Sequence, residues 1–391
     1  MEYKLRPYQE KCVETCHNYF KYGKSNDNPI ACLPTGSGKS LIIASLAKIL
    51  GDGVLVINPQ KELLEQNYAK YEGYGGVASI YSASMGMKEV GMATFATIGS
   101  IVEQAEKFAH VRYIIIDECH LVPPKPNSMF MYFIRNMPNV KVLGLSATPF
   151  RLKKYRDPWT GLPMSKINLL PREKPKFFNK FIHVTQISEM YEQGYLARIK
   201  YMPIDWDDGK LIVNTTGAEY TDKSIDEALR EQKVYERLPD IIQKSIEQGR
   251  KYRVVFVNSV ADAEQLASVV PDSHCVSAKT PKKERERILN DFKAGKIKTI
   301  FNVGVLTIGF DFPALDTVII ARPTMSLALY MQMIGRGIRV HESKQYCAVV
   351  DFCGNYKRFG KIENLEYKQD YKGNWVLVNE GKILTGVKME K

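Results

Sequence analysis

The chain of 391 residues has no Cys-x-x-Cys pair, no apolar run near the roughly 18 residues of a membrane span, and no short repeat or low-complexity tract. Its first seven residues, MEYKLRP, contain no apolar core for a signal peptide. The seven cysteines are scattered, and although Cys12 and Cys16 lie four residues apart, no second ligand pair exists. We therefore expect a reduced cytosolic protein with no membrane segment, no zinc and a cysteine-bearing helix face packed on its core.

Acidic side chains are the scarcer charged class. The sequence has 43 Asp and Glu residues against 55 Lys and Arg residues, which gives a formal net charge of +12. This excess of positive charge favours a polyanionic partner such as a nucleic acid. The hydrophobic content of 45% is that of an ordinary globular protein, and the length suffices for two or three domains with separate cores.

Short apolar runs alternate with helical stretches in two parts of the chain. The runs lie at residues 53–59, 111–117 and 140–146, and again at 252–257, 298–303 and 317–320. Continuously apolar strands separated by helices indicate parallel sheets that are covered on both faces. We therefore predict an α/β protein with two tandem parallel-sheet domains, at residues 1–150 and 235–355.

The remaining segments differ in character. Between residues 151 and 180, nine basic side chains face two acidic ones, and four prolines exclude a long helix. Trp159, Phe177 and Phe178, with Phe181 just after this stretch, favour packing or stacking over the alternative, a solvated tether. We expect residues 151–234 to form a basic, extended inter-domain insertion. Residues 356–391 are expected to form a C-terminal β extension, with a hairpin that turns at Lys372-Gly373-Asn374.

The segment from Pro34 to Ser40 has the pattern of a phosphate-binding loop. Gly36 and Gly38 allow backbone amides to face phosphate oxygens, and the following helix adds its positive N-terminal end. We expect Lys39 to reach the β- and γ-phosphates of ATP and Ser40 to hold Mg²⁺. Thr35 and Ser37 complete the loop, although the strict pattern asks for glycine where this chain has Leu33.

Two carboxylates follow the apolar run that ends at Ile116. Open α/β sheets bind ligands at the carboxyl ends of their strands, so Asp117 and Glu118 are expected at such a site. We predict that Asp117 holds Mg²⁺ and that Glu118 orients and deprotonates the attacking water. The alternative interpretation is a solvated acidic strand end.

The motifs together identify a family resemblance. Asp117-Glu118-Cys119-His120, with Ser146-Ala147-Thr148, strongly resembles a DExH-type superfamily 2 helicase, and the resemblance covers residues 5 to about 355. It implies two RecA-like domains and ATP with Mg²⁺ as cofactors. It also implies the following residue roles: Arg6 and Gln9 at the adenine; Pro59, Gln60, Thr94, Thr97 and Thr307 on the nucleic acid; Gly309 and Asp311 at the ribose; Gln332, Arg336 and Arg339 as the arginine-finger motif; and His120, Ser146 and Thr148 in coupling.

Within that superfamily, residues 309–355 most resemble RadD-like DNA-repair helicases, followed by phage branch-migration helicases such as UvsW. The zinc-binding tail of the RadD type is absent, since nothing after Cys353 supplies ligands. The resemblance implies an ATP-dependent DNA helicase in replication, recombination or repair, in the cytoplasm of a bacterium or a phage-infected host. Its expected partner is single-stranded, forked or branched DNA, with RNA as the second choice.

Two alternatives stay open. One is a double-strand translocase that does not separate strands, and the other is a nucleic-acid-binding module with a degenerate nucleotide site. A small-molecule kinase leaves the arginine motif and the second domain unexplained. We further expect Lys153, Lys154 and Arg156 in the basic insertion to contact the nucleic acid.

Overall fold

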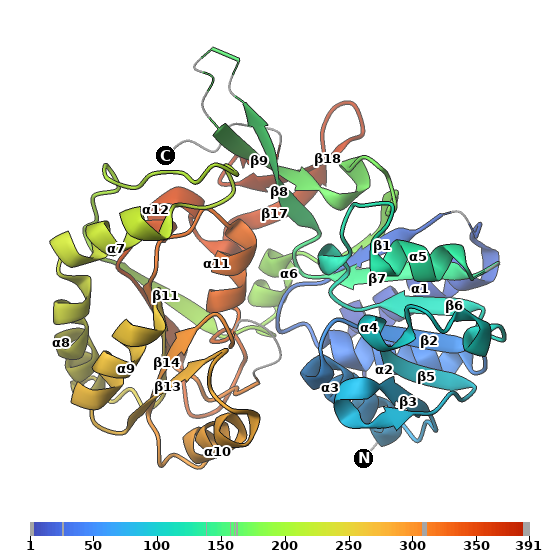
Figure 1. Cartoon of the computed structure of the whole chain (residues 1–391), viewed down its shortest axis with the longest axis horizontal. Coiled ribbons are helices and arrows are strands. Elements are labelled where there is room, and N and C mark those ends of the chain that lie inside the picture. The colour runs from blue at the N-terminus through green and yellow to red at the C-terminus, as the bar shows by residue number, and fades with distance from the viewer. Residues whose placement is uncertain are drawn as a thin grey trace. The chain divides into compact units, whose positions relative to one another are not determined.

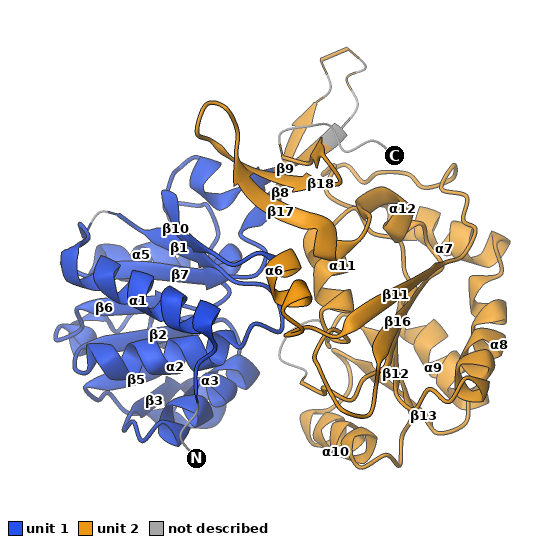
Figure 2. Ribbon diagram, turned by 180° about the vertical axis from the view of Figure 1, so that it is seen from behind, with its two compact units in different colours: residues 1–151, 168–186 blue, residues 152–167, 187–391 orange. Residues whose placement is uncertain are grey.

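The computed structural model describes residues 4–25, 27–137, 139–156, 158–159, 161, 163–306 and 311–385. The chain divides into two compact units (Figure 1 and Figure 2). Unit 1 contains residues 1–151 and 168–186, and unit 2 contains residues 152–167 and 187–391. Each unit has helices packed on a mainly parallel sheet, which confirms the predicted α/β fold class with two parallel-sheet domains.

Unit 1 is built on an eight-stranded sheet whose strands are parallel except for the last pair. In spatial order these are β10 (Lys180–Val184), β1 (Pro29–Cys32), β7 (Lys141–Ser146), β6 (Tyr113–Ile116), β2 (Val54–Asn58), β5 (Ala93–Thr97), β3 (Ser79–Ser82) and β4 (Met87–Lys88). Every residue of β1 and β2 is buried, as expected for central strands covered on both faces.

Helices cover both faces of that sheet. One core contains buried side chains of α1, α2 and α3 against strand residues such as Val56 and Leu143, and it includes Cys12 and Cys16 as the sequence predicted. The opposite face is covered by α4 and α5, and Phe133 of α5 packs edge to face on Phe108 of the 3-10 turn η2. The elements are α1 (Pro7–Tyr22), α2 (Lys39–Leu50), α3 (Lys61–Gly73), α4 (Ile98–Ile101) and α5 (Met129–Arg135), with short 3-10 turns η1 (Ala83–Met85), η2 (Ala105–Phe108), η3 (Cys119–Leu121) and η4 (Leu170–Arg172).

Unit 2 has an all-parallel sheet of six strands. In spatial order these are β11 (Arg198–Pro203), β16 (Tyr346–Asp351), β15 (Thr317–Ala321), β12 (Arg253–Val257), β14 (Thr299–Val303) and β13 (Ser273–Ser277). Buried residues of three consecutive helices pack against strand residues such as Val255 and Phe301 to form its core. Those helices are α7 (Asp222–Glu231), α8 (Val234–Glu247) and α9 (Val260–Val269).

Further elements complete unit 2. An antiparallel sheet near the C-terminus contains β17 (Leu365–Gln369), β18 (Trp375–Asn379) and β19 (Lys382–Ile383), so the predicted C-terminal hairpin is confirmed. The helices are α6 (Ile187–Glu192), α10 (Lys282–Lys293), α11 (Leu327–Ile334) and α12 (Asn355–Phe359), and the 3-10 turn is η5 (Ile362–Asn364). Among the described helices, none is long and apolar enough to cross a membrane.

The stretch from 151 to 234, which we expected to be one extended insertion, is shared between the units. It begins with a two-stranded hairpin, β8 (Phe150–Arg156) and β9 (Pro163–Leu169), and its described part has no α-helix before α6, as the prolines predicted. β10 then joins the sheet of unit 1 beside β1, and β11 joins the sheet of unit 2 beside β16. β10 and β11 are thus edge strands of the two sheets.

Candidate nucleotide site and nucleic-acid contacts

Three neighbouring strands of unit 1 bring the predicted catalytic segments together. The phosphate-binding loop follows β1, Asp117 and Glu118 follow β6, and Ser146 ends β7. The sheet order places β7 between β1 and β6, and all three strands are parallel. Their carboxyl ends therefore meet at one edge, where open α/β sheets bind ligands.

The loop has the backbone geometry that its glycines predicted. Gly36 has φ 82° and Gly38 has φ 75°, in the left-handed region that favours glycine. A Cβ on Gly38 would lie 2.6 Å from Nε2 of Gln9, so close packing also requires glycine there. Gly38 is the N-cap of α2, and the amides of the first helical turn offer donors to an anion. The buried hydroxyl of Ser37 has no partner among the described residues.

The first turn of α1 contacts this loop. Oε1 of Gln9 accepts a hydrogen bond from the Arg6 amide at 2.8 Å, and its Nε2 donates to the Ser37 carbonyl at 2.7 Å. The Tyr8 hydroxyl donates to the same carbonyl at 2.7 Å. Gln9 is buried and joins the expected adenine-reading segment to the phosphate loop. Sequence reasoning did not single out Tyr8, because a tyrosine beside a proline has no distinctive pattern.

The two carboxylates occupy different electrostatic environments. Asp117 is buried, and its oxygens accept hydrogen bonds from the Glu118 amide at 2.8 Å and from Nδ2 of Asn67 at 2.8 Å. Burial and the charge of Glu118 raise the pKa of Asp117 to about 6. Burial opposes ionisation of Glu118 too, but attraction by Lys39 and His120 outweighs it and lowers the pKa of Glu118 to about 2. Glu118 is therefore the carboxylate that keeps its charge.

A continuous set of side-chain contacts crosses the strand ends. Nζ of Lys39 lies 3.3 Å from one oxygen of Glu118, whose other oxygen lies 3.3 Å from Nδ1 of His120. The same His120 nitrogen lies 2.8 Å from Oγ of Ser146, which accepts a hydrogen bond from the Thr148 amide at 3.0 Å. The phosphate loop is thus linked, through the acid, to the segment after β7. These are the residues expected to act in catalysis and coupling.

Two further groups hold this arrangement and were missed from the sequence. Asn67 on α3 also donates to Oδ1 of Asn58 at 2.6 Å, and all of these groups are buried. Arg151 donates to the carbonyls of His120, at 2.8 Å, and of Val122. Its guanidinium also contacts Glu173 at 2.5 Å. Arg151 therefore anchors the segment after Glu118, although its sequence context suggested one more cation of the basic insertion.

The residues present fit Mg²⁺ with a nucleotide. Mg²⁺ prefers carboxylate and hydroxyl oxygens together with phosphate oxygens. Asp117 supplies a buried carboxylate beside the loop, and Ser40 supplies a hydroxyl in the first turn of α2. The left-handed glycines and the orphan Ser37 hydroxyl are features of a loop shaped for an oxyanion.

In unit 2, the predicted arginine motif spans the end of α11. Nε of Arg336 donates to the Gln332 carbonyl at 3.4 Å, and Arg339 forms an ion pair with Asp311. Gly337 allows close packing, because a Cβ there would overlap Sγ of Cys347. The expected contacts Thr307 and Gly309 lie outside the described residues.

The expected nucleic-acid contacts of unit 1 lie in different surroundings. Pro59 and Gln60 follow β2 at the carboxyl edge, and Gln60 is exposed. Thr97 ends β5 at the same edge, where its hydroxyl lies 2.9 Å from that of Ser100. Thr94 is buried inside β5, and its hydroxyl exchanges hydrogen bonds with the Gly91 backbone. The structure thus gives Thr94 a role within the sheet.

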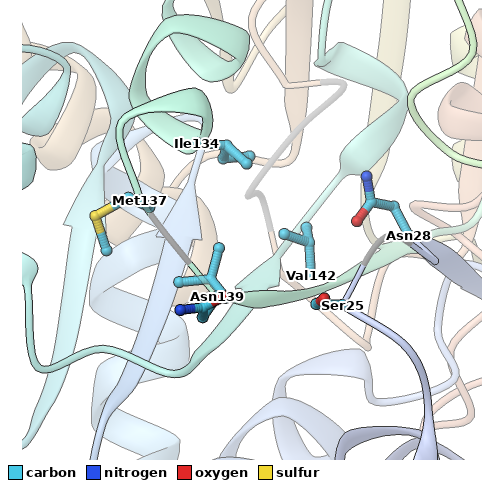
Figure 3. Close-up of a pocket in the computed structure, with 7 residues that line it drawn as sticks. Ser25, Asn28, Ile134, Met137, Asn139 and Val142 are labelled. Atoms are coloured by element: carbon cyan, nitrogen blue, oxygen red, sulfur yellow. The ribbon is translucent and has the colours of Figure 1, made fainter.

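A separate cavity of about 290 Å³ lies near the opposite edge of the unit 1 sheet. Ser25 and Asn28, which precede β1, lie on one side, and Met137 and Asn139, which precede β7, lie on the other (Figure 3). The lining residues of the described chain carry no ionisable side chain. This cavity is therefore not part of the nucleotide site.

Two family models match the chain. Residues 2–151 match the "Type III restriction enzyme, res subunit" model, and residues 233–341 match the "Helicase conserved C-terminal domain" model. A Saccharomyces cerevisiae protein named as the ATP-dependent helicase IRC3 is 25% identical over 90% of this chain and 51% of its own length. The "51.5 kDa protein" of a Lactococcus phage is 24% identical over 88% of this chain and 69% of its own length.

A solved structure has the same fold. It is a fragment named as an HsdR subunit of a type I restriction enzyme from Vibrio vulnificus, with a TM-score of 0.69 and 18% identity, over 92% of this chain and 67% of that chain. The chain thus spans about half of the yeast relative and two thirds of the phage relative and the solved fragment. The likeness to the solved fragment establishes the architecture of the chain.

Proposed function

We propose that this chain, whose two domains are those of superfamily 2 helicases, is an ATP-dependent DNA helicase. The observation that carries the proposal is the set of contacts from Lys39 through Glu118 and His120 to Ser146. These groups connect a phosphate-binding loop to the segment that leaves β7. A binding module with a degenerate nucleotide site has no need of an ionised Glu118 held between Lys39 and His120.

In this proposal the loop amides and Lys39 bind the phosphates of ATP. Lys39 exchanges Glu118 for the γ-phosphate, and Glu118 then orients a water molecule and accepts its proton. The contact of His120 with Ser146 transmits the change at Glu118 to the segment after β7. Mg²⁺, held by Ser40 and Asp117, would neutralise negative charge on the phosphates.

Arg336 and Arg339 of unit 2 are proposed to stabilise the charge that develops on the γ-phosphate. Arginine fingers contribute on the order of 10³–10⁵ in rate in other phosphoryl-transfer systems. Arg339 now pairs with Asp311, so its engagement requires an exchange of partners. The ribose role of Asp311 and Gly309 and the strand role of Thr307 remain part of this proposal.

The proposed substrate is single-stranded, forked or branched DNA, in replication, recombination or repair. The formal charge of +12 and the exposed Lys153, Lys154 and Arg156 support a polyanionic partner. Within superfamily 2, the proposed similarity of this chain to RadD-like and UvsW-like helicases is based on residues 309–355. No disulfide joins the described cysteines, which supports the cytoplasm of a bacterium or a phage-infected cell.

Phosphate release titrated with single-stranded DNA, forked DNA and single-stranded RNA tests this function. We expect slow basal turnover and stimulation by DNA, strongest with the fork. Stimulation by RNA alone would identify an RNA helicase. Absence of turnover with every nucleic acid, under conditions where a fluorescent ATP analogue binds, would refute the helicase and leave a binding module.

A double-strand translocase is the second candidate, and the match to a restriction-enzyme subunit model favours it. Two substrates separate the candidates. A helicase unwinds a short fork in an ATP-dependent manner, whereas a translocase displaces a third strand from an intact duplex and leaves the fork paired. Unwinding of the fork supports the proposal, and third-strand displacement alone replaces it by the translocase.

The basic hairpin gives a separate test of nucleic-acid binding. Replacement of Lys153, Lys154 and Arg156 by serine should weaken fork binding and flatten its salt dependence by roughly one unit for each phosphate that is no longer bound. The matched control replaces three exposed lysines on helices of the same unit: Lys223, Lys244 and Lys293. Equal salt slopes for both triple variants would show that the hairpin cations do not bind phosphate.

A further inference from the structure

Two hairpins of unit 2 each expose an aromatic side chain at the turn. Trp159, between β8 and β9, is 90% exposed, and Tyr371, between β17 and β18, is 92% exposed. The other tryptophans, Trp206 and Trp375, are partly buried. An aromatic ring left in water forfeits the burial free energy that such residues otherwise contribute to a core. Neither ring therefore contributes its apolar surface to the core of the unit.

The first hairpin carries positive charge along its length. Lys153, Lys154 and Arg156 are exposed, and they form no ion pair within the described part of the chain. Arg156 donates to the Gly161 carbonyl at 3.2 Å across the turn. Nζ of Lys166 lies 5.4 Å from the centre of the Tyr155 ring, on the partner strand. Trp159 thus lies at the turn of a hairpin whose strands carry several cationic side chains.

The second hairpin holds its aromatic ring on a fixed turn. Oδ1 of Asp370 accepts hydrogen bonds from the amides of Lys372 and Asn374, both at 2.8 Å. Gly373 has φ 75°, which this turn requires. Tyr371 lies within the turn, and Nζ of Lys372 lies 5.3 Å from the centre of its ring. The ring is therefore held away from the sheet beside a cation.

The two hairpins share one base. Ile167 of β9 forms a parallel bridge with Thr385, and both residues are buried. The hydroxyl of Thr385 accepts a hydrogen bond from the Leu377 amide of β18 at 3.2 Å. Both views show β8, β9, β17 and β18 together at one end of unit 2 (Figure 1 and Figure 2). An isolated hairpin is marginally stable, so these contacts at the shared base stabilise both hairpins.

From this arrangement we propose that Trp159 and Tyr371 form two stacking points for unpaired DNA bases, on a cationic support made of the paired hairpins. The inference rests on the proposed function, since it names how unit 2 holds the strand. Aromatic rings accept any base, and neighbouring lysines bind the phosphates between the bases. A protein partner is disfavoured, because the exposed side chains that precede Trp159 along β8 are cations rather than apolar groups.

Fluorescence anisotropy with a labelled single-stranded oligonucleotide tests the stacking. Trp159→Ala should weaken binding roughly 5- to 150-fold, as alanine substitution does for one stacked base, and Trp159→Phe should restore most of it. Tyr371→Ala should act in the same direction. The salt slope should stay unchanged, because every phosphate-binding cation is kept. Tyr22→Ala is the matched control, since Tyr22 is 72% exposed in unit 1 and its ring centre lies 5.0 Å from Nζ of Lys21.

An oligonucleotide with abasic sites makes the test specific for the ring. It should bind wild type more weakly than the intact strand does, and it should bind the double variant Trp159→Ala/Tyr371→Ala about as well as the intact strand does. Stacking would be overturned if Trp159→Ala lost the same affinity, relative to wild type, for the abasic oligonucleotide as for the intact one. It would also be overturned if Trp159→Ala and Tyr371→Ala bound the intact oligonucleotide within twofold of the affinity of Tyr22→Ala. Those outcomes, with DNA-stimulated ATPase intact in wild type, leave the helicase standing. Absence of that stimulation in wild type would instead remove the helicase and this inference together.

Discussion

Replacement of Glu118 by glutamine tests the chemistry of the nucleotide site most directly. The substitution keeps the side-chain size and removes the charge and the proton acceptor. The distance of 3.3 Å from Lys39 to Glu118 corresponds to a Coulomb energy of about 1 kcal/mol at the dielectric constant of water. At an effective value of 20 it is about 5 kcal/mol. This attraction exists in the free protein and is given up when Lys39 turns to the phosphates.

ATP should therefore bind Glu118→Gln at least as tightly as it binds wild type, because the variant has less attraction to break and one negative charge fewer near the γ-phosphate. Turnover should fall by roughly 10²–10⁴, the usual contribution of a general base. Phosphate release measures turnover, and anisotropy of a fluorescent ATP analogue measures binding. Lys39→Ala should lose binding as well as turnover. A turnover rate of Glu118→Gln within tenfold of wild type would refute the assignment of the base.

Four further outcomes are expected. Arg339→Ala should lower DNA-stimulated ATP hydrolysis at least tenfold while a fluorescent nucleotide still binds; an unaltered rate would refute the arginine finger. Arg151→Ala should reduce the free energy of unfolding of unit 1 by roughly 2–4 kcal/mol in denaturant titrations, and prior removal of Glu173 should lessen that loss. Gly337→Ala should cost about 1–3 kcal/mol in unit 2 through overlap with the neighbouring thiol, measured in the same way. Burial, with a smaller effect of a nearby lysine, lowers the pKa of His183 from 6.5 to about 4, so between these pH values the unfolded chain binds a proton that the folded chain does not. The free energy of unfolding of wild type should therefore fall more than that of His183→Gln as the pH is lowered from 6.5 to 4. Equal pH dependences of the two free energies would contradict this.

Local sequence was sufficient to find the residues at strand ends. The phosphate-binding loop, Asp117 and Ser146 each follow a short, continuously apolar run, and parallel strands place their carboxyl ends at one edge. The left-handed conformation of the loop glycines could also be predicted from the sequence, because the motif of the loop requires it. The C-terminal hairpin was predicted from its turn residues and the apolar strand that follows them.

The residues that hold the catalytic side chains in place could not be predicted from local sequence. Asn67 reaches Asp117 from a helix fifty residues earlier, and Arg151 reaches His120 and Glu173 from a segment whose neighbours are exposed cations. The sequence alone does not say which of many polar side chains will be the hydrogen-bond or ion-pair partner of a polar residue on a helix or of an arginine in a basic stretch. Only packing selects one of them.

The sequence by itself determined the kind of protein: two apolar parallel sheets, a phosphate-binding loop, two acids after a strand, and a distant arginine motif. Tertiary structure decided how the basic stretch is used, because the residues from Lys180 to Val184 pair with the open edge of unit 1 while β8 and β9 attach to unit 2. It also decided that Thr94 faces the interior and that Trp159 and Tyr371 face solvent. Strand pairing and side-chain burial depend on which distant segments supply hydrogen bonds and apolar contacts, and no local pattern contains that information.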